Sequence, residues 1–190
     1  RGRIRTNTSY IKTTMTMGKS REYPLYIQNT GKGETGTITL ALPSWIETVT
    51  PRQMPSLASG DSATIILRFV PTESMRLNVP VTGHFGINCT NGYGASVSFQ
   101  LTPVSEETGT LTVDVVDEFT FFTTEAPHVS MASVKVKNMS TGQVVAQGVT
   151  NEKGTFSAEM TEGWYSVTVD ADNHESQTQE VMVDPGENNK

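Results

Sequence analysis

The sequence predicts an all-β protein, and three observations support this prediction. Short runs of alternating apolar and polar residues recur roughly every 8–14 residues, with turn-forming residues between them. No longer run shows the period of about 3.6 residues that an amphipathic helix requires. Glycine and proline, 16 and 9 of the 190 residues, recur too often for long helices. We therefore expect two tandem antiparallel β-sandwiches.

The distribution of charge indicates where the first sandwich ends. Residues 1–104 contain 10 Lys and Arg against 5 Asp and Glu, a net charge of +5. Residues 105–190 contain 4 against 15, a net charge of −11. The polar stretch "LTPVSEETG", with Pro103 and Gly109, lies at this step and resembles a linker. The predicted domains are residues 1–104 and 105–190, and each has the usual size of one sandwich.

The first half contains several segments that alternate as strands do. The clearest is "SATIILRF", in which Ile65, Leu67 and Phe69 share one face and Arg68 lies on the other. The pair Asn91-Gly92 predicts a tight turn within a hairpin. The predicted strands lie in residues 21–28, 37–42 and 59–71 and in the hairpin 79–103.

The second half shows the same alternation. In "MASVKVKN", Ala132, Val134 and Val136 are expected to point inward, and Lys135 and Lys137 outward. A self-formed Lys–Asn isopeptide bond requires a buried lysine, so we do not expect one here. The predicted strands lie in residues 110–117, 131–138, 144–150, 155–160, 164–171 and 179–184.

The motifs of the second half have a family resemblance. The stretches "MASVKVKN", "STGQVVAQGVTNEKGTFS" and "EGWYSVTVDADNHES" give residues 109–184 a resemblance to the carboxypeptidase regulatory-like family, which has a transthyretin-like β-sandwich. Met131 and Asn151 depart from the family's Gly and Asp. The resemblance implies a hairpin whose turn needs Gly154. The matching positions are Ala132, Val134, Thr150, Gly154, Phe156, Gly163, Tyr165, Val167, Val169 and Ala171.

The motifs of the first half also resemble a known kind of domain, but less specifically. Its Asn-Thr-Gly turn, the Pro-x-Trp corner at Trp45 and the Gly-Asp-Ser before a strand resemble the immunoglobulin-like domains found beside bacterial glycosidases. Neither family is enzymatic. Together the two resemblances imply a structural or adhesive module of a larger secreted or cell-surface bacterial protein, acting as a spacer or protein-interaction domain. The alternative is a carbohydrate-binding or accessory module of an extracellular peptidase or glycosidase.

Composition narrows the set of partners. No basic stripe with interleaved aromatic residues suggests nucleic-acid binding, and no apolar run is long enough to enter a membrane. The chain opens at Arg1 without Met, so we expect a segment of a longer protein whose neighbouring domains are its first partners. A protein or glycan ligand is the further expectation.

Trp164 is the main candidate for a ligand-binding residue. Tyr165, Val167 and Val169 form an inward face, so Trp164 is expected to point outward. It could cover a neighbouring domain or partner, lie over its own sheet edge, or stack on a sugar ring. Tyr93, on the turn "NGYG", is a second candidate for glycan binding.

The loop "EFTFFTTEAPHVS" supplies candidate interface residues. Phe121 and Phe122 are adjacent, so alternation points them in opposite directions and cannot bury both. We expect part of this apolar surface to contact another domain or to form a binding site.

Catalytic, metal and cofactor sites are not expected. The three histidines, His84, His128 and His174, form no zinc motif, and the chain has no nucleophile elbow or phosphate loop. The stretch from Asp170 to Glu175 is the best calcium candidate, but a solvated strand end is the simpler interpretation. Cys89 is the single cysteine, so no intrachain disulfide forms, and we expect it to be a small buried residue.

Overall fold

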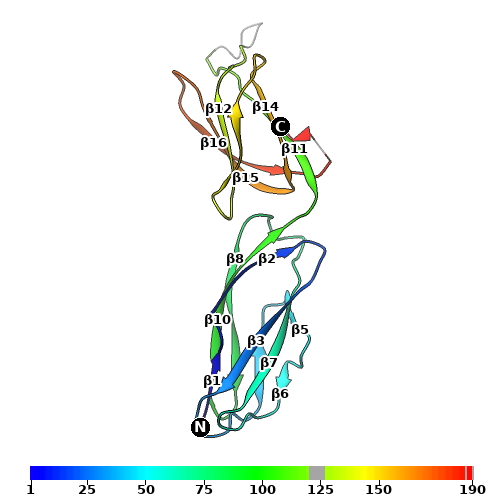
Figure 1. Cartoon of the computed structure of the whole chain (residues 1–190), viewed down its shortest axis with the longest axis vertical. Coiled ribbons are helices and arrows are strands. Elements are labelled where there is room, and N and C mark those ends of the chain that lie inside the picture. The colour runs from blue at the N-terminus through cyan, green and yellow to red at the C-terminus, as the bar shows by residue number, and fades with distance from the viewer. Residues whose placement is uncertain (120–126, 187, 190) are drawn as a thin grey trace. The chain divides into compact units, whose positions relative to one another are not determined.

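The computed structural model describes residues 1–119, 127–186 and 188–189, which contain strands and turns and no helix (Figure 1). The prediction of an all-β sandwich fold is confirmed. The chain forms two compact units. Unit 1 comprises Arg1–Met75 and Pro80–Pro103, and unit 2 comprises Arg76–Val79 and Val104–Lys190.

Unit 1 consists of two five-stranded sheets. The first has the order β5-β7-β3-β1-β9 and the second the order β2-β10-β8-β4-β6. The pairs β1–β3, β3–β7, β5–β7, β4–β6, β4–β8 and β8–β10 are antiparallel, whereas β1 and β9 are parallel. The strands are β1 (Gly2–Thr6), β2 (Tyr10–Thr16), β3 (Arg21–Asn29), β4 (Ile38–Ala41), β5 (Ile46–Thr48), β6 (Gln53–Met54), β7 (Ser62–Phe69), β8 (Val81–Cys89), β9 (Gly92–Tyr93) and β10 (Ala95–Val104).

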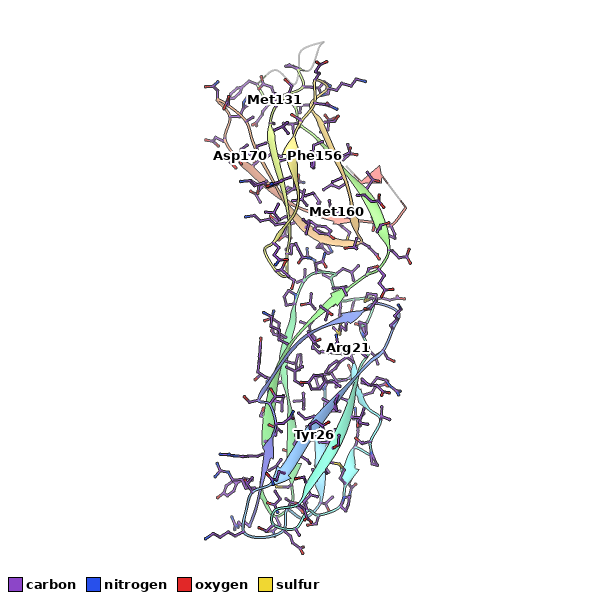
Figure 2. The ribbon with its side chains drawn as sticks, in the orientation of Figure 1. Arg21, Tyr26, Met131, Phe156, Met160 and Asp170 are labelled. Atoms are coloured by element: carbon purple, nitrogen blue, oxygen red, sulfur yellow. The ribbon has the colours of Figure 1, made fainter. Side chains whose placement is uncertain are left out.

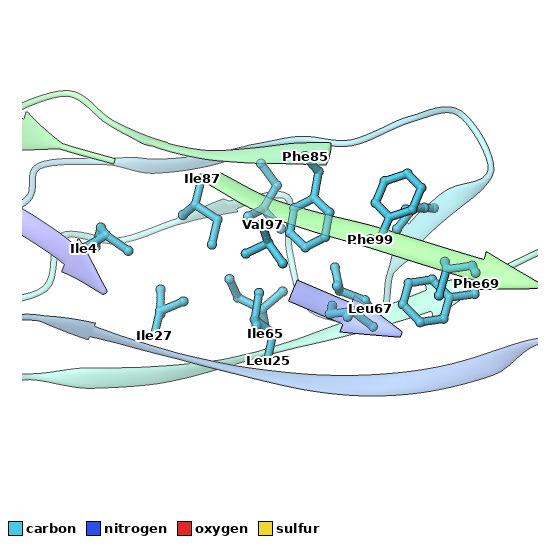
Figure 3. Packing of buried hydrophobic residues seen from close by; sticks show 14 of the residues in the cluster. Ile4, Leu25, Ile27, Ile65, Leu67, Phe69, Phe85, Ile87, Val97 and Phe99 are labelled. Atoms are coloured by element: carbon cyan, nitrogen blue, oxygen red, sulfur yellow. The ribbon is translucent and has the colours of Figure 1, made fainter. Parts of the chain in front are cut away.

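The core of unit 1 lies between these sheets, as the alternation predicts. Ile65, Leu67 and Phe69 on β7 are fully buried, and they face Phe85 and Phe99 on the opposite sheet (Figure 3). Trp45 packs against this cluster with its ring perpendicular to that of Phe99, at 5.3 Å between centroids. Successive side chains on a strand alternate between faces, so each strand contributes every second residue to the core.

The two strands at the start of the chain were not predicted. In β1 only Ile4 is a large inward residue, because Arg3 and Arg5 point to solvent. In β2 the inward positions are Ile11 and Met15, with Thr13 between them. One or two inward apolar residues are too few to predict a strand from the sequence. The two strands form because β1 pairs with β3 and β2 pairs with β10.

The predicted hairpin forms, but its turn differs from the prediction. β8 and β10 pair antiparallel from Ala95↔Ile87 to Leu101↔Val81. The Asn91-Gly92 pair is not a two-residue turn, because the connection runs from Thr90 to Gly94. Within it, β9 pairs with the start of β1, and the N–H of Gly2 donates to the carbonyl of Asn91 at 3.0 Å. This long-range pairing with the first residues of the chain competes with the local turn preference.

Unit 2 consists of a three-stranded and a four-stranded sheet. Their orders are β14-β11-β17 and β13-β12-β15-β16. Strands β11 and β17 are parallel and the other pairs are antiparallel. The strands are β11 (Thr108–Asp114), β12 (Ser133–Asn138), β13 (Val144–Val149), β14 (Thr155–Thr161), β15 (Gly163–Asp170), β16 (Gln177–Val183) and β17 (Asn188–Asn189).

The turn after β13 leads into the other sheet. We expected a hairpin here, but β14 pairs with β11 and not with β13. The side chain of Asn151 shapes the turn, because its Oδ1 accepts from the N–H groups of Lys153 and Thr155. Gly154 has a φ of 71°, which confirms that a glycine conformation is needed there. A Cβ at this position would lie 2.7 Å from the carbonyl oxygen of Val115.

The core of unit 2 follows the predicted pattern. Val134 and Val136 on β12 and Tyr165 and Val167 on β15 are buried, whereas Lys135 is exposed. The hydroxyl of Tyr165 donates to the carbonyl of Thr161 at 2.7 Å, so the polar end of this buried side chain is satisfied. Strand β14 carries Phe156 and Met160 into the same cluster (Figure 2).

Candidate functional site

Trp164 lies near the start of β15 and is half-buried. The guanidinium carbon of Arg76 lies 4.0 Å from the centroid of its ring, the geometry of a cation–π contact. The same guanidinium binds Glu180 of β16, with 3.1 Å between Nη2 and Oε2. All three residues belong to unit 2. One face of the outward-pointing indole is therefore covered within its own unit.

The backbone of Trp164 is hydrogen-bonded to the two residues that follow Arg76. The N–H of Trp164 donates to the carbonyl of Leu77 at 3.2 Å, and Nδ2 of Asn78 donates to the carbonyl of Trp164 at 3.4 Å. Gly163 makes this approach possible, because a Cβ there would lie 2.4 Å from Nδ2 of Asn78. Two backbone bonds and a cation–π contact thus fix the position of Trp164.

Tyr93 lies on β9 and is 65% exposed. It belongs to unit 1 and Trp164 to unit 2, so the two candidate glycan residues do not share one compact unit. Phe121 and Phe122 lie outside the described residues. Phe119, just before them, is 91% exposed, and its N–H donates to Oδ1 of Asp117 at 3.0 Å.

The stretch from Asp170 to Glu175 forms an exposed turn after β15. Asn173 has a φ of 63°, and the N–H of His174 donates to the carbonyl of Ala171 at 3.1 Å. Asp170 and Met131, both labelled in Figure 2, are among the residues that line a hollow of about 370 Å³. Among the described residues, no three His, Cys, Asp or Glu side chains lie close enough together to hold a metal ion.

Cys89 lies at the end of β8, partly buried against the core of unit 1. Burial raises the pKa of its thiol, because desolvation disfavours the thiolate. This is the opposite of what an activated nucleophile requires.

A large cavity in unit 2 was not predicted. It has a volume of about 700 Å³ and lies between the edge of β11 and the inner faces of β15 and β16. The sequence signal that could have indicated it is the set of valines at the end of β11 and just after it, Val113, Val115 and Val116, which one strand face cannot bury together. The cavity is lined by Leu111, Thr112, Val113, Asp114, Val115, Val116, Glu118, Phe119, Val129, Val167, Val169, Ala171, Asn173, His174, Glu175, Gln177, Gln179 and Val181.

The cavity has an apolar floor and an acidic rim. Val113 of β11 and Val167 and Val169 of β15 form the floor, whereas the carboxylates of Asp114, Glu118 and Glu175 lie among the exposed lining residues. Two histidines lie close to carboxylates in this region. Nδ1 of His128 lies 3.3 Å from Oδ1 of Asp114, and Nε2 of His174 lies 3.7 Å from Oδ1 of Asp117. Such a site suits a ligand with both apolar and basic groups.

The comparisons with solved structures give distant similarities. The PapD-like domain 7 of human CEP192 is 13% identical over 55% of this chain and 87% of its own, with a TM-score of 0.44. The major pilin subunit BcpA of Bacillus cereus is 10% identical over 96% of this chain and 65% of its own, with a TM-score of 0.37. A Porphyromonas gingivalis protein of unknown function is 10% identical over 95% and 99%, with a TM-score of 0.43.

No curated protein matches the sequence. The family model that does match is that of the carboxypeptidase regulatory-like domain, over residues 123–190. This segment holds strands β12 to β17 and therefore most of unit 2. The preceding part of the chain is all-β, which is consistent with an immunoglobulin-like sandwich. Residues 123–190 match the model of the carboxypeptidase regulatory-like domain family, which confirms the resemblance predicted for the second half of the chain.

Proposed function

We propose that the chain is a non-catalytic structural and protein-interaction module of a larger secreted or cell-surface bacterial protein. The observation that carries this proposal is the fixed position of Trp164. Its indole is covered by Arg76, which also binds Glu180, and its backbone bonds to Leu77 and Asn78. The outward-pointing tryptophan of unit 2 thus contributes to the stability of its own unit.

Two further features support the proposal. Residues 123–190 match a domain family whose members, by the resemblance, accompany other domains as accessory modules. Both units are built from paired strands around apolar cores, which suits a module that spaces or presents its neighbours. No helix capable of spanning a membrane occurs in the described ranges.

Fractionation of the source cells tests the localisation. An antibody raised against the chain should detect it in the cell-surface or secreted fraction, with a cytoplasmic enzyme as the control for lysis. Detection only in the cytoplasmic fraction would contradict the proposal.

Glycan binding is the second candidate function, and the exposure of Tyr93 favours it. The ring is 65% exposed, and an accessible aromatic face can stack on the apolar face of a sugar. A polysaccharide panel with wild type, Trp164→Ala and Tyr93→Ala tests this candidate. Tyr26, 53% exposed on β3, supplies the matched control Tyr26→Ala (Figure 2).

The two functions predict different results in this panel. A structural module binds no polysaccharide with or without these substitutions. Binding by wild type that is lost in Tyr93→Ala or Trp164→Ala, and retained in Tyr26→Ala, would replace the structural proposal with glycan binding.

A further inference from the structure

We propose that the outer face of β1 in unit 1 binds an extended acidic segment of a protein partner. The segment would carry Asp or Glu at alternate positions, opposite the arginines of this strand. Arg1, Arg3 and Arg5 form the binding surface, the arginine row. This inference rests on the proposed role in protein interaction, and it names the surface and the chemistry of the partner.

The alternation of residues along β1 places its arginines on one face. Arg1, just before the strand, and Arg3 and Arg5 within it are exposed, whereas Gly2 and Ile4 between them are buried. Alternate residues of a strand point to the same side, about 6.6 Å apart at roughly 3.3 Å per residue. The outer face of the sheet therefore presents three arginine side chains in a line.

The arginine row differs from the other charged positions of its sheet in lacking a carboxylate partner. Among residues 1–119, 127–186 and 188–189, no ion pair involves Arg1, Arg3 or Arg5. Arg68 provides the contrast, because it lies on the same sheet and its Nη2 is 3.1 Å from Oε1 of Glu22. The row thus carries positive charge that is available to an anionic partner.

The loop between β3 and β4 adds a further positive charge beside the row. Gly31 and Gly33 pack against Arg1, since a Cβ on them would lie 2.5 Å from its carbonyl oxygen and 2.9 Å from its nitrogen, respectively. Lys32 lies between these glycines and is exposed. Glu34 in the same loop supplies one negative charge, so an excess of positive charge remains and favours an anionic ligand.

Tyr93 gives the surface an apolar contact beside the arginines. Strand β9 pairs with β1 so that Tyr93 lies opposite Arg3, and the tyrosine is 65% exposed. Side chains opposite each other on neighbouring strands project from the same face of a sheet. Ninety positions separate the two residues in the sequence, so only the fold brings them together. Tyrosine and arginine are both enriched in protein interfaces.

An extended polypeptide fits this surface better than a nucleic acid does. Its alternate side chains repeat with the spacing of the arginine row, because both are extended chains with two residues per repeat. Each carboxylate of the segment would meet one guanidinium, whose planar fork pairs with both oxygens of a carboxylate. Single-stranded nucleic acids bind where successive aromatic rings stack on the bases, whereas one tyrosine, Tyr93, lies in register with the arginine row.

A fluorescently labelled seven-residue peptide of alternating Glu and Val tests the surface on the full chain by anisotropy. One control peptide has the same composition with its glutamates grouped, and a second alternates Gln and Val. We expect the alternating acidic peptide to bind at least fivefold more tightly than either control. Equal binding of the grouped peptide would reduce the effect to net charge and overturn the match between the two repeats.

Two double substitutions that remove the same charge locate the binding site. Arg3→Ser/Arg5→Ser removes two arginines of the row, whereas Arg21→Ser/Arg52→Ser removes two exposed arginines elsewhere in unit 1. The first variant should weaken binding of the alternating acidic peptide at least fivefold, and the second should leave it within about twofold. Equal weakening by both would overturn the assignment to β1. Circular dichroism of each variant establishes that it is folded.

Tyr93→Ala and Tyr26→Ala form a second matched pair. Both rings are exposed on the same sheet, and Tyr26 is labelled in Figure 2. Tyr93→Ala should weaken peptide binding about threefold, because the ring lies beside Arg3, and Tyr26→Ala should leave it within about 1.5-fold. An equal or larger loss in Tyr26→Ala would overturn the placement of the segment beside β9.

Three other outcomes would replace the acidic segment by another ligand and overturn the inference. Displacement of the peptide by polygalacturonate or by single-stranded oligothymidylate, at a tenfold lower concentration of charge, would assign the surface to an acidic polysaccharide or a nucleic acid. Self-association in sedimentation velocity that Arg3→Ser/Arg5→Ser abolishes would assign it to a second copy of the chain. A folded chain that binds none of the peptides would also overturn the inference, whereas the proposed surface localisation is tested by fractionation alone.

Discussion

In unit 1, two five-stranded sheets enclose sixteen buried apolar residues, from Ile4 on β1 to Leu101 on β10. In unit 2, a three-stranded and a four-stranded sheet enclose a cluster of seven among the described residues. Beside that smaller cluster lies the cavity of about 700 Å³. Both units have strands of similar length, so the number of strands in each sheet, and not the pattern within a strand, decides how completely a sandwich closes.

Inward-facing valines are buried to different extents in the two units. Val97 on β10 faces the core of unit 1 and is fully buried. Val113 and Val181 face the interior of unit 2, yet both line the cavity and are only partly buried. An inward direction buries a side chain only where a partner strand lies opposite, because burial requires contact on all sides.

Truncating one leucine in each unit gives the largest expected effect. Leu67 and Leu111 are equally buried, but Leu111 lines the cavity. Leu67→Ala should lower the free energy of unfolding of unit 1 by about 3–5 kcal/mol, near the upper end for such truncations. Leu111→Ala enlarges an existing cavity, so we expect a smaller loss of about 2–3 kcal/mol in unit 2.

Urea unfolding followed by tryptophan fluorescence measures each unit separately, because Trp45 lies in unit 1 and Trp164 in unit 2. The background Trp164→Phe reports on unit 1, and Trp45→Phe reports on unit 2. An equal loss of unfolding free energy in the two units would show that Leu111 is packed as tightly as Leu67 despite the cavity.

Two glycines of unit 2 test how closely its strands are packed at the turn between its sheets. Gly154 and Gly142 have similar φ values, 71° and 67°. A Cβ on Gly154 would meet Val115 and His128 at 2.7 Å, whereas nothing lies within 4 Å at Gly142. Both Ala substitutions should cost about 1–2 kcal/mol of backbone strain, and Gly154→Ala about 1–3 kcal/mol more from overpacking. Thermal unfolding of the two variants measures the difference, and equal melting temperatures would contradict it.

Adding one methyl group to a valine tests the cavity directly. Val97→Ile adds volume to a filled core and should destabilise unit 1 by about 1–3 kcal/mol. Val181→Ile adds the same group beside the cavity and should leave the stability of unit 2 within about 0.5 kcal/mol. Urea unfolding in the same single-tryptophan backgrounds provides the measurement. A destabilisation by Val181→Ile as large as that by Val97→Ile would mean that the cavity is filled.

Removing Arg76 gives the smallest expected effect. Its side chain is 45% exposed and that of Glu180 53%, so water screens their ion pair. Arg76→Ala should destabilise unit 2 by about 0.5–1 kcal/mol, mainly through the lost cation–π contact. The emission of Trp164 should shift to longer wavelength, measured in the Trp45→Phe background. Arg21→Ala, which removes a bond to Thr14 in unit 1, is the control. An unchanged emission maximum would contradict the role of Arg76.

Local sequence patterns determined the fold class and most of the core. The inward positions of β7, β12 and β15 follow from strict alternation, and each was predicted because a strand with one buried face needs that pattern. The need for glycine at Gly154 and the outward direction of Trp164 also follow from local geometry. These features depend on residues within a few positions of one another, so the sequence alone contains them.

Pairing between distant residues was decided only by the tertiary structure. Strand β9 forms because Gly92 and Tyr93 meet the first residues of the chain, and β14 joins β11 although it follows β13. The partner of Trp164, Arg76, lies 88 positions earlier in the sequence. The cavity is lined by residues of β11, β15 and β16, which lie far apart in the sequence. The alternation of residues along a strand indicates which face is apolar. Which strand covers that face depends on the contacts of the whole fold.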